Sequence, residues 1–583
     1  MTTRIPPLES AEPWSRPALR FADSFTRELP GDSAMPTTPP YEMQSDGEIP
    51  VSESVFRMSR SVRGALWSWA VPAEHDNARL VSFCKSGAHL LGLTSEDYND
   101  VLRNPQSAAA VWSGNKRLPG SNPWAHCYGG HQFGVWADQL GDGRAISLGQ
   151  VDNGDDTWEV QLKGAGRTPY SRFADGFAVR RSSIREYLVA EHMSALGVPT
   201  SRSLSLVFTD RVVEREEPEL GAVVARLAQS WVRFGSFELP ASRGDFKLLR
   251  ELADYVIQNY YPEELDQTQS KYIRLLQCVI ERTAGMVAAW QTAGFCHGVM
   301  NTDNMSILGL TIDYGPFAFL DAYDPDFICN HSDPAGRYAF NEQPRVALWN
   351  LVRLAGPLSR LVDADPTSDA SAETLEAVTQ ALSQFSSVYS RKYAGIMCRK
   401  LGLAPDHDNG DDMANVVQPF LDLLERGHTD YTFAMRSICD VPQLLTTSGD
   451  TELLLKRHVN SLAERSDCNR LDSKWQEDMR SFFSDVYGPR LAAQGVTDQQ
   501  AALSLSASMQ LANPCHVLRN WVAQDIIEQA DEKGNVAYVD QALELLTTYA
   551  FAGNVPEHLK EMAERYAGPV PKWGEGLQCS CSS

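Results

Sequence analysis

The sequence predicts an α+β fold in which a strand-rich N-terminal part is followed by a helical C-terminal part. Between about residues 125 and 240, short apolar segments are separated by turns rich in glycine and aspartate, a pattern typical of β-strands. From about residue 245 onward, apolar residues recur at the spacing of α-helices. Strands followed by helices is the order of an α+β protein with two lobes.

The N-terminal part is predicted to hold several strands and one helix. Residues 145–151 and 158–162 are apolar or alternate between Gly-Asp turns, and residues 204–207 and 222–227 return to this pattern. A helix is predicted over residues 183–196, because Gly197-Val-Pro199 would end it.

The C-terminal part is predicted to be helical almost throughout. Amphipathic helices are expected over residues 345–361 and 374–397, and an acidic loop over residues 404–412. Helices resume up to residues 517–527, before a tail that contains glycine and proline. We therefore expect four regions: an N-terminal arm, extended or partly disordered, at residues 1–50; a strand-rich lobe at 51–240; a helical lobe at 241–490; and a helical extension with a cysteine-containing tail at 491–583.

The composition is that of an ordinary globular protein, with 43% hydrophobic and 22% charged residues. The formal net charge of −23 argues against a nucleic-acid or membrane-surface binder, which would need a basic face. No apolar run approaches the roughly 18 residues that a membrane helix requires, so no membrane insertion is expected.

Cysteine usage predicts buried thiols for most of the 11 cysteines, because they are scattered singly along the chain. The exception is the C-terminal pair Cys579 and Cys581, which either forms a redox-active disulfide or belongs to an unimportant polar tail. The N-terminus mixes arginines with acidic residues, which makes it a weak targeting signal.

The most informative motif runs from His297 to Asn304 and is followed by Asp313-Tyr-Gly315. It keeps the spacing of a protein-kinase catalytic loop and its metal-binding aspartate. The catalytic base, however, is replaced by Val299, which has no lone pair to accept a proton. Asn304 and Asp313 still supply the hard oxygen ligands that suit Mg²⁺.

Asp303 offers another carboxylate within this loop. It can replace the missing base only if the reacting phosphorus lies in a different place. The alternatives are a third carboxylate near the metal or a simple loop cap.

Upstream residues indicate a site for phosphate groups. Gly141 and Gly143 would let backbone amides approach an anion beside Arg144, although a plain hairpin turn has the same pattern. Lys163 ends an apolar strand, as does the phosphate-binding lysine of kinases, and it could equally be a surface lysine. Glu186 either pairs with Lys163 or closes a capping box that begins at Ser183.

Several arginines cluster in this region although the chain as a whole is acidic, with a net charge of −23. Such a cluster favours an anionic ligand, because the guanidinium fork binds phosphate through two hydrogen bonds. Asp175-Gly176 lies in the loop before the predicted helix. The clustered arginines are Arg144, Arg167, Arg172, Arg180, Arg181, Arg226 and Arg233.

Taken together, long stretches of this chain resemble the selenoprotein O family of protein adenylyltransferases, in particular a fungal-type or other cysteine-containing eukaryotic member. The resemblance implies a kinase-like fold that binds ATP in reversed orientation and transfers AMP to Ser, Thr or Tyr hydroxyls of proteins. The chain itself is a further candidate acceptor. The stretches lie at residues 20–32, 128–144, 162–176, 179–186, 297–307 and 513–520.

The same resemblance implies roles for individual residues. Asp303 would be the proton acceptor, and Asn304 and Asp313 would bind Mg²⁺, with Mn²⁺ as the alternative. Cys581 stands at what looks like the position of the family's selenocysteine, and the family implies a mitochondrial location. Contacts with ATP would come from Gly141, Gly143, Arg144, Lys163, Asp175, Gly176, Arg226, Arg233 and Asp313.

Two other functions compete with AMP transfer. A conventional protein kinase would transfer the γ-phosphate with Asp303 as base. A catalytically inactive, pseudokinase-like scaffold would bind ATP without using it, as the valine at position 299 suggests.

Overall fold

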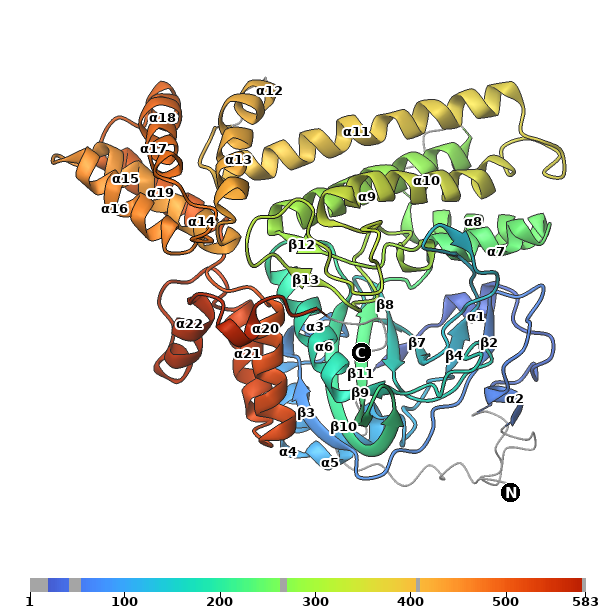
Figure 1. Ribbon diagram of the computed structural model, residues 1–583. Coiled ribbons are helices and arrows are strands. Elements are labelled where there is room, and N and C mark those ends of the chain that lie inside the picture. Colours follow the sequence, from blue (N-terminus) through green and yellow to red (C-terminus); the bar gives the residue numbers. More distant parts are fainter. Residues whose placement is uncertain (1–18, 41–53, 263–269, 405–408, 579–583) are drawn as a thin grey trace.

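A computed structural model describes residues 19–40, 54–262, 270–404 and 409–578 (Figure 1). Its N-terminal part is built on a nine-stranded sheet in which neighbouring strands pair antiparallel. β1 (Arg20–Phe21) pairs with β7, and β9 (Ala178–Val179) pairs with β11. Across the sheet the other strands follow the order β2 (Trp67–Trp69), β4 (Trp124–His126), β7 (Ala145–Asp152), β8 (Thr157–Lys163), β11 (Pro218–Ala228), β10 (Arg202–Glu214) and β3 (Arg79–Phe83).

The four predicted strands are present, and two of them are longer than predicted. β10 and β11 extend well beyond their apolar centres. The apolar pattern does not reveal their hairpin ends, because these carry exposed polar residues such as Asp210 and Glu214. β7 and β8 match the predicted ranges closely. A short hairpin pairs β5 (His131–Gln132) with β6 (Val135–Trp136), and a separate two-stranded sheet pairs β12 (Phe295–Cys296) with β13 (Ala318–Phe319).

Residues 19–40 of the expected N-terminal arm lie against the sheet. β1 adds to β7, and the side chains of Phe25 and Leu29 are buried. Residues 1–18 and 41–50 of the arm fall outside the described residues.

Helix α6 (Arg180–Ala195) begins before the predicted start at residue 183. Val179 is its N-cap and Ser183 lies within the helix, so the capping-box interpretation of Glu186 is wrong. The chain turns into the helix directly from β9, and Arg180 is held there by the Thr209 carbonyl. The other helices of this part are α1 (Ser24–Glu28), α2 (Ser54–Arg57), α3 (Lys85–Leu90), α4 (Ser95–Arg103) and α5 (Pro105–Trp112).

Beyond the sheet the chain is mainly helical, as predicted, apart from the short strands β12 and β13. Both amphipathic helices predicted there are present. The first begins and ends two residues before the predicted limits, and the second extends beyond its predicted range at both ends; the side chain of Ser371 caps the second and thereby defines its start. These are α10 (Gln343–Ser359) and α11 (Ala372–Lys400). Both pack on α9 (Lys271–Ala293), α10 also packs on α7 (Phe234–Ser242), and α8 (Phe246–Tyr260) packs on α7 and α9.

Shorter helices at the far end of α11 surround a separate hydrophobic core (Figure 1). Residues 405–408 of the predicted acidic loop are outside the described residues, whereas residues 409–412 are helical, so the loop prediction is wrong there. These helices are α12 (Asn409–Asp412), α13 (Gln418–Gly427), α14 (Tyr431–Ser437), α15 (Val441–Thr446), α16 (Thr451–Ala463), α17 (Ser473–Ser481), α18 (Gly488–Ala493) and α19 (Gln499–Gln510).

The last helices return to the sheet-containing part. α21 contacts both α6 and β3, and Arg180 of α6 forms an ion pair with Asp531. None of the helices in the described ranges is both long and apolar enough to cross a lipid bilayer. The returning helices are α20 (Asn520–Ile527), α21 (Ala537–Thr547) and α22 (Lys560–Ala567).

Candidate active site

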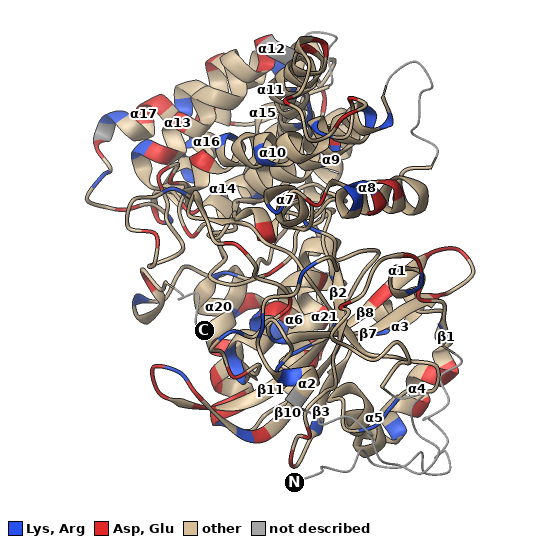
Figure 2. Ribbon diagram, turned by 90° about the vertical axis from the view of Figure 1, so that its right-hand side faces the viewer, with Lys and Arg blue, Asp and Glu red and all other residues tan. Residues whose placement is uncertain are grey.

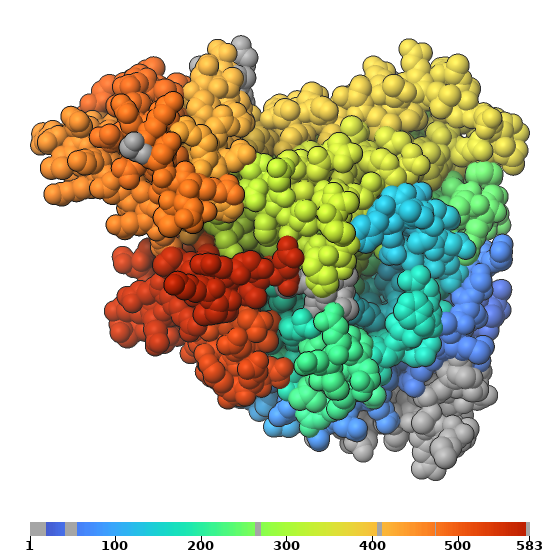
Figure 3. All heavy atoms as spheres, viewed as in Figure 1, coloured from blue at the N-terminus to red at the C-terminus, as the bar shows by residue number. Residues whose placement is uncertain are grey.

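The candidate site lies where the sheet meets the helical part. The space-filling view shows this face hollowed between residues coloured yellow-green, near 300–340, and residues coloured cyan to green, in the sheet-containing part (Figure 3). The loop from His297 to Asn304 follows β12 and ends in a 3₁₀ turn, Thr302–Asn304. His297 is buried, and its Nε2 donates to the carbonyl oxygen of Ile312, which ties the loop to the segment that carries Asp313.

A buried ion-pair network joins the strands, α6 and this loop region. Nζ of Lys163, at the end of β8, lies 2.6 Å from a carboxylate oxygen of Glu186 on α6. Arg226 of β11 lies 2.8 Å from Glu186 and 3.2 Å from Asp313. Arg233 lies 3.1 Å from the other oxygen of Asp313. Glu186 therefore pairs with Lys163, the first of its two predicted roles.

Mutual attraction holds this network in its charged form. Burial alone would raise the pKa of Asp313, but Arg233, Arg226 and Lys163 lower it. Glu186 is similar: burial acts to raise its pKa, and Lys163 and Arg226 lower it. Burial lowers the pKa of Lys163, and Glu186 acts against that effect. Figure 2 shows both basic and acidic segments on and around α6.

Two further residues of the network, Asp142 and Gln161, are not among the site residues that the sequence predicts. Asp142 is buried and receives a hydrogen bond from Arg233 at 3.0 Å, and Gln161 accepts two from Arg226. Gln161 precedes Lys163 by two positions and so faces the same side of β8, which the two-residue period of a strand could have revealed. Arg226 and Arg233 also lie over the rings of Trp231 and Tyr128, respectively.

Asp303 is buried at the edge of this network with only 8% of its surface exposed. Gln132 of the β5–β6 hairpin donates Nε2–H to Oδ2 at 3.1 Å. Oδ1 is buried and has no hydrogen-bond partner among the described residues. Burial raises the pKa of Asp303 to about 7. A buried carboxylate with one free oxygen is equipped to accept a proton from a ligand.

Asn304 and Asp313 are the candidate metal ligands. A bridge between Met305 and Thr311 holds their segments together. Asn304 donates Nδ2–H to the carbonyl of Val299 at 2.9 Å, which leaves its Oδ1 as the atom suited to a cation. No cluster of three or more His, Cys, Asp or Glu side chains suited to a metal occurs in the described residues. Two oxygen ligands fit Mg²⁺, which is usually held by few protein groups together with phosphate oxygens.

The remaining predicted residues lie around the network in different ways. Arg144 is half-buried, and within the described ranges no carboxylate lies within 4.0 Å of its guanidinium. Burial lowers the pKa of Arg144, and Glu186 acts against that effect. Asp175 is paired with Arg215 at 2.9 Å instead of with a member of the network.

The glycines at the predicted phosphate site are required by close packing. Gly141 has φ +88°, and a Cβ there would lie 2.4 Å from the ring of Tyr170. Gly176 has φ +84°, and a Cβ would lie 2.4 Å from the backbone nitrogen of Arg167. At Gly143 a Cβ would lie 3.1 Å from the carbonyl oxygen of Tyr170. A side chain at any of these three positions would therefore force its neighbours to move.

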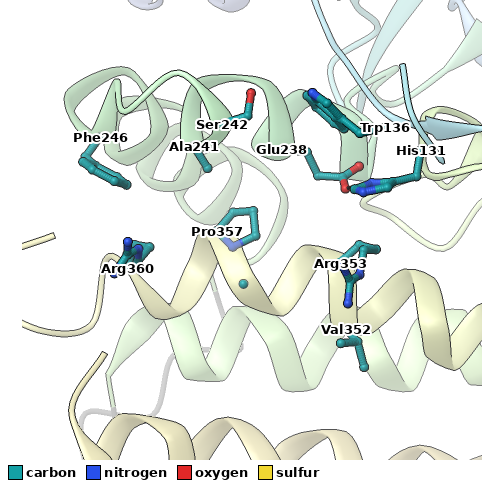
Figure 4. Close-up of a pocket in the computed structure, with 11 residues that line it drawn as sticks. His131, Trp136, Glu238, Ala241, Ser242, Phe246, Val352, Arg353, Pro357 and Arg360 are labelled. Carbon is teal, nitrogen blue, oxygen red and sulfur yellow. Dashed lines mark hydrogen bonds and ion pairs between the residues drawn. The ribbon is translucent and has the colours of Figure 1, made fainter. Parts of the chain in front are cut away.

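A cavity of about 610 Å³ lies on the other side of the β5–β6 hairpin and is lined by none of the predicted site residues. Figure 4 shows His131 and Glu238 facing Arg353 of α10 across it. Nδ1 of His131 lies 2.6 Å from Glu238 Oε1, and its backbone nitrogen donates to Thr302 at 2.7 Å. His131 of the hairpin thus contacts both the cavity and the catalytic loop.

The cysteines agree with the prediction of buried thiols. None of those in the described residues forms a disulfide, and all but Cys468 and Cys515 are buried. Cys579 and Cys581 lie outside the described residues.

Comparisons with known proteins decide the family. The family described as "Protein adenylyltransferase SelO" matches residues 55–547. The chain belongs to this family. It is therefore an enzyme, a protein adenylyltransferase, and its α+β fold is of the kinase-like type that the SelO family has.

Curated bacterial relatives of this chain carry the description "Protein nucleotidyltransferase YdiU". The protein from an Enterobacter species is 43% identical over 514 residues, covering 88% of this chain and 96% of that protein. The protein from Thiobacillus denitrificans is 42% identical over 86% of this chain and 93% of its own length. The family activity implies ATP and a divalent metal ion as cofactors, and proteins as substrates.

Proposed function

We propose that the chain transfers AMP from ATP to Ser, Thr or Tyr hydroxyls of proteins, itself included, with release of pyrophosphate. The observation that carries this proposal is Oδ1 of Asp303, a buried oxygen that has no hydrogen-bond partner in the described part of the chain, on a carboxylate whose charged form Arg233 favours. Val299 cannot serve as a base, and the carboxylate of Asp303 can.

In the proposed reaction Asp303 accepts the proton of the acceptor hydroxyl. The hydroxyl oxygen forms a bond to the α-phosphorus, and the bond from that phosphorus to the bridging oxygen of pyrophosphate breaks. This requires ATP to lie reversed relative to its orientation in a kinase, so that the α-phosphate faces Asp303. Gln132 holds the other oxygen of Asp303 and thereby orients the carboxylate.

The charge that develops on pyrophosphate is proposed to be neutralised by Lys163, Arg144, Arg226 and Arg233. Arg144 supports this role, because it is half-buried and no carboxylate of the described residues lies within 4.0 Å of its guanidinium. Glu186 is proposed to support the site by holding Lys163 at 2.6 Å. Further ATP contacts are assigned to Gly141, Gly143, Asp175 and Gly176.

Asn304 and Asp313 are proposed to hold Mg²⁺, with Mn²⁺ as the alternative. A bound divalent ion would stabilise negative charge on the phosphate oxygens. Both oxygens of Asp313 accept hydrogen bonds from Arg226 and Arg233 in this structure. When phosphates attract these arginines, the carboxylate of Asp313 becomes free for the metal.

Labelled ATP tests the reaction. The purified chain is incubated with a protein acceptor, a divalent ion and ATP labelled at either the α- or the γ-phosphate. Covalent label retained from the α-position alone is expected. Label retained only from the γ-position would identify a protein kinase, and nucleotide binding without label from either would identify an inactive scaffold.

The location and the tail stay open to experiment. We propose a mitochondrial location and a redox-sensitive Cys579–Cys581 pair, both on the resemblance to the selenoprotein O family. Under oxidising conditions, substitution Cys581→Ser is expected to abolish a tail disulfide on nonreducing analysis. A bridge that persists in this variant would exclude the pair.

A further inference from the structure

A second cavity lies far along the helical part, away from the catalytic loop. It has a volume of about 630 Å³, within the range of about 300 to 1,000 Å³ that is usual for small-molecule sites. It forms where the C-terminal end of α11 meets α19 and the segment just after α6, a junction near the far end of α11 in Figure 1. Its apolar lining includes Leu196, Val198, Ile396, Leu403, Leu505 and Phe551.

One lysine is buried in the lining of this cavity. Lys400, the last residue of α11, is only 6% exposed. Within the described ranges, its Nζ has a single hydrogen-bond partner, Oδ1 of Asn513 at 3.3 Å. No carboxylate oxygen of those residues lies within 4.0 Å of Nζ, in contrast to Lys163, whose partner Glu186 lies at 2.6 Å.

A buried ammonium without a counter-ion is costly, because it loses its hydration and gains no opposite charge. Burial lowers the pKa of Lys400 to about 8, and the nearby thiol of Cys439 acts against that effect. The amide of Asn513 cannot turn away, because its Nδ2 donates to the carbonyl oxygens of Lys400 and Met509. Nζ of Lys400 therefore keeps N–H donors that Asn513 does not engage, and Lys400 is one of the residues that line the cavity.

The surroundings indicate what kind of anion would fit. Leu511 lines the cavity and is 76% exposed, which is unusual for a large apolar side chain. An apolar ligand that lies on Leu511 would remove part of this side chain's surface from water. Arg399, also in the lining, is exposed and adds a second positive charge. An apolar body with one negative head group matches both features.

We propose that this cavity is a binding site for an amphipathic monoanion of the aliphatic carboxylate class. The carboxylate accepts a hydrogen bond from Nζ of Lys400, and the hydrocarbon chain lies along the apolar lining. Segment 513–520, which the reaction does not use, then has a role: its first residue, Asn513, orients the lysine. The ligand also contacts Leu196 to Val198, directly after the helix that carries Glu186.

Calorimetric titration of the full chain tests the site with three probes of equal chain length: decanoate, decanol and decyltrimethylammonium. Decanoate is expected to bind about tenfold or more tightly than decanol, since a hydrogen bond to a charged group contributes about 1.5 to 3 kcal/mol. Lys400→Met is expected to reduce decanoate affinity to that of decanol and to leave decanol unchanged. Lys400→Arg is expected to keep the preference for decanoate.

Lys392→Met is the matched control, because Lys392 lies on the same helix and is exposed. Should Lys400→Met fail to fold, Leu505→Trp fills the cavity without touching the lysine and is expected to weaken both decanoate and decanol. Equal affinity for decanoate and decanol, unchanged decanoate binding in Lys400→Met, or no binding of either probe would overturn the proposal. So would displacement of decanoate by ATP, which would place the ligand in the active site instead.

Discussion

At the scale of single residues, the loop from His297 to Asn304 carries Val299 at the position of the kinase base and a buried carboxylate, Asp303, four positions later. Val299 is buried and contributes only its backbone carbonyl, which accepts a hydrogen bond from Asn304. Asp303 has one oxygen held by Gln132 and the other unpartnered among the described residues. These contacts are compatible with the proposal that Asp303, instead of a residue at position 299, accepts the proton.

Asp303→Asn is expected to lower the rate of AMP transfer by about 10²- to 10⁴-fold, the usual contribution of a general base. The substitution keeps the shape of the side chain, so ATP affinity should change little. The measurement is α-labelled transfer alongside ATP binding by calorimetry. A variant that retains more than a tenth of the activity would exclude Asp303 as the proton acceptor.

Glu186→Gln is expected to destabilise the fold by about 3 to 5 kcal/mol, because it leaves Lys163 and Arg226 buried without their shared carboxylate. Urea denaturation measures the effect. Glu219→Gln serves as the control, since its ion pair with Arg181 is partly exposed and should contribute less than about 1 kcal/mol. Equal losses in the two variants would contradict the special importance of the buried pair.

At the scale of elements, the β5–β6 hairpin is the part of the sheet side that reaches the catalytic loop. The backbone nitrogen of His131 donates to Thr302, that of Phe133 donates to Asn301, and the side chain of Gln132 donates to Asp303. Three consecutive residues of the hairpin thus hold three consecutive residues of the loop. We infer that the hairpin positions the base.

Gln132→Met is expected to lower kcat for AMP transfer about tenfold and to leave KM for ATP unchanged, because only the hydrogen bond to Asp303 is lost. Steady-state kinetics with varied ATP separates the two constants. Gln132→Glu should be worse than Gln132→Met, since it brings a second carboxylate next to Asp303. A rise in KM without a fall in kcat would instead assign Gln132 to nucleotide binding.

At the scale of the whole molecule, helices from the C-terminal part of the chain pack against α6 of the sheet-containing part. Helix α21, from the C-terminal part of the chain, packs on α6, and His192 of α6 donates Nδ1–H to the carbonyl oxygen of Leu546. Helix α6, which carries Glu186, thus lies between strands β10 and β11 on one side and α21 on the other. Burial lowers the pKa of His192 to about 4, so it remains neutral in the folded protein at neutral pH.

This histidine makes the packing of α21 on α6 sensitive to acid. In the unfolded chain its pKa is about 6.5, so between pH 6.5 and 4 the unfolded state binds the proton and the folded state does not. The stability that neutral His192 contributes is complete above pH 6.5 and is lost as the pH falls toward 4. His192→Asn should therefore be less harmful at pH 5 than at pH 7.5, by about 2 kcal/mol in urea denaturation. A difference that is the same at both pH values would contradict this assignment.

Much of the fold and of the candidate site could be predicted from local patterns. The strands β7 and β8 and the helices α10 and α11 follow from apolar periodicity, because one face of each must be buried. The start of α6 was missed, because its first turn is stabilised by groups distant in the sequence, such as the carbonyl of Thr209. The helix at residues 409–412 was missed, because its acidic composition resembles a loop.

By itself the sequence determined the chemical inventory of this protein: a valine in place of the base, oxygen ligands for a metal, and arginines in an acidic chain. The tertiary structure alone decided how these groups are used. Glu186 could have capped its helix or paired with Lys163, and the choice depends on burial, which makes an unpaired lysine costly. Asp142, Gln161 and Gln132 join the site only because folding brings distant segments within hydrogen-bond distance. Sequence spacing carries no information about such contacts, since it records neighbours along the chain and not those across the core.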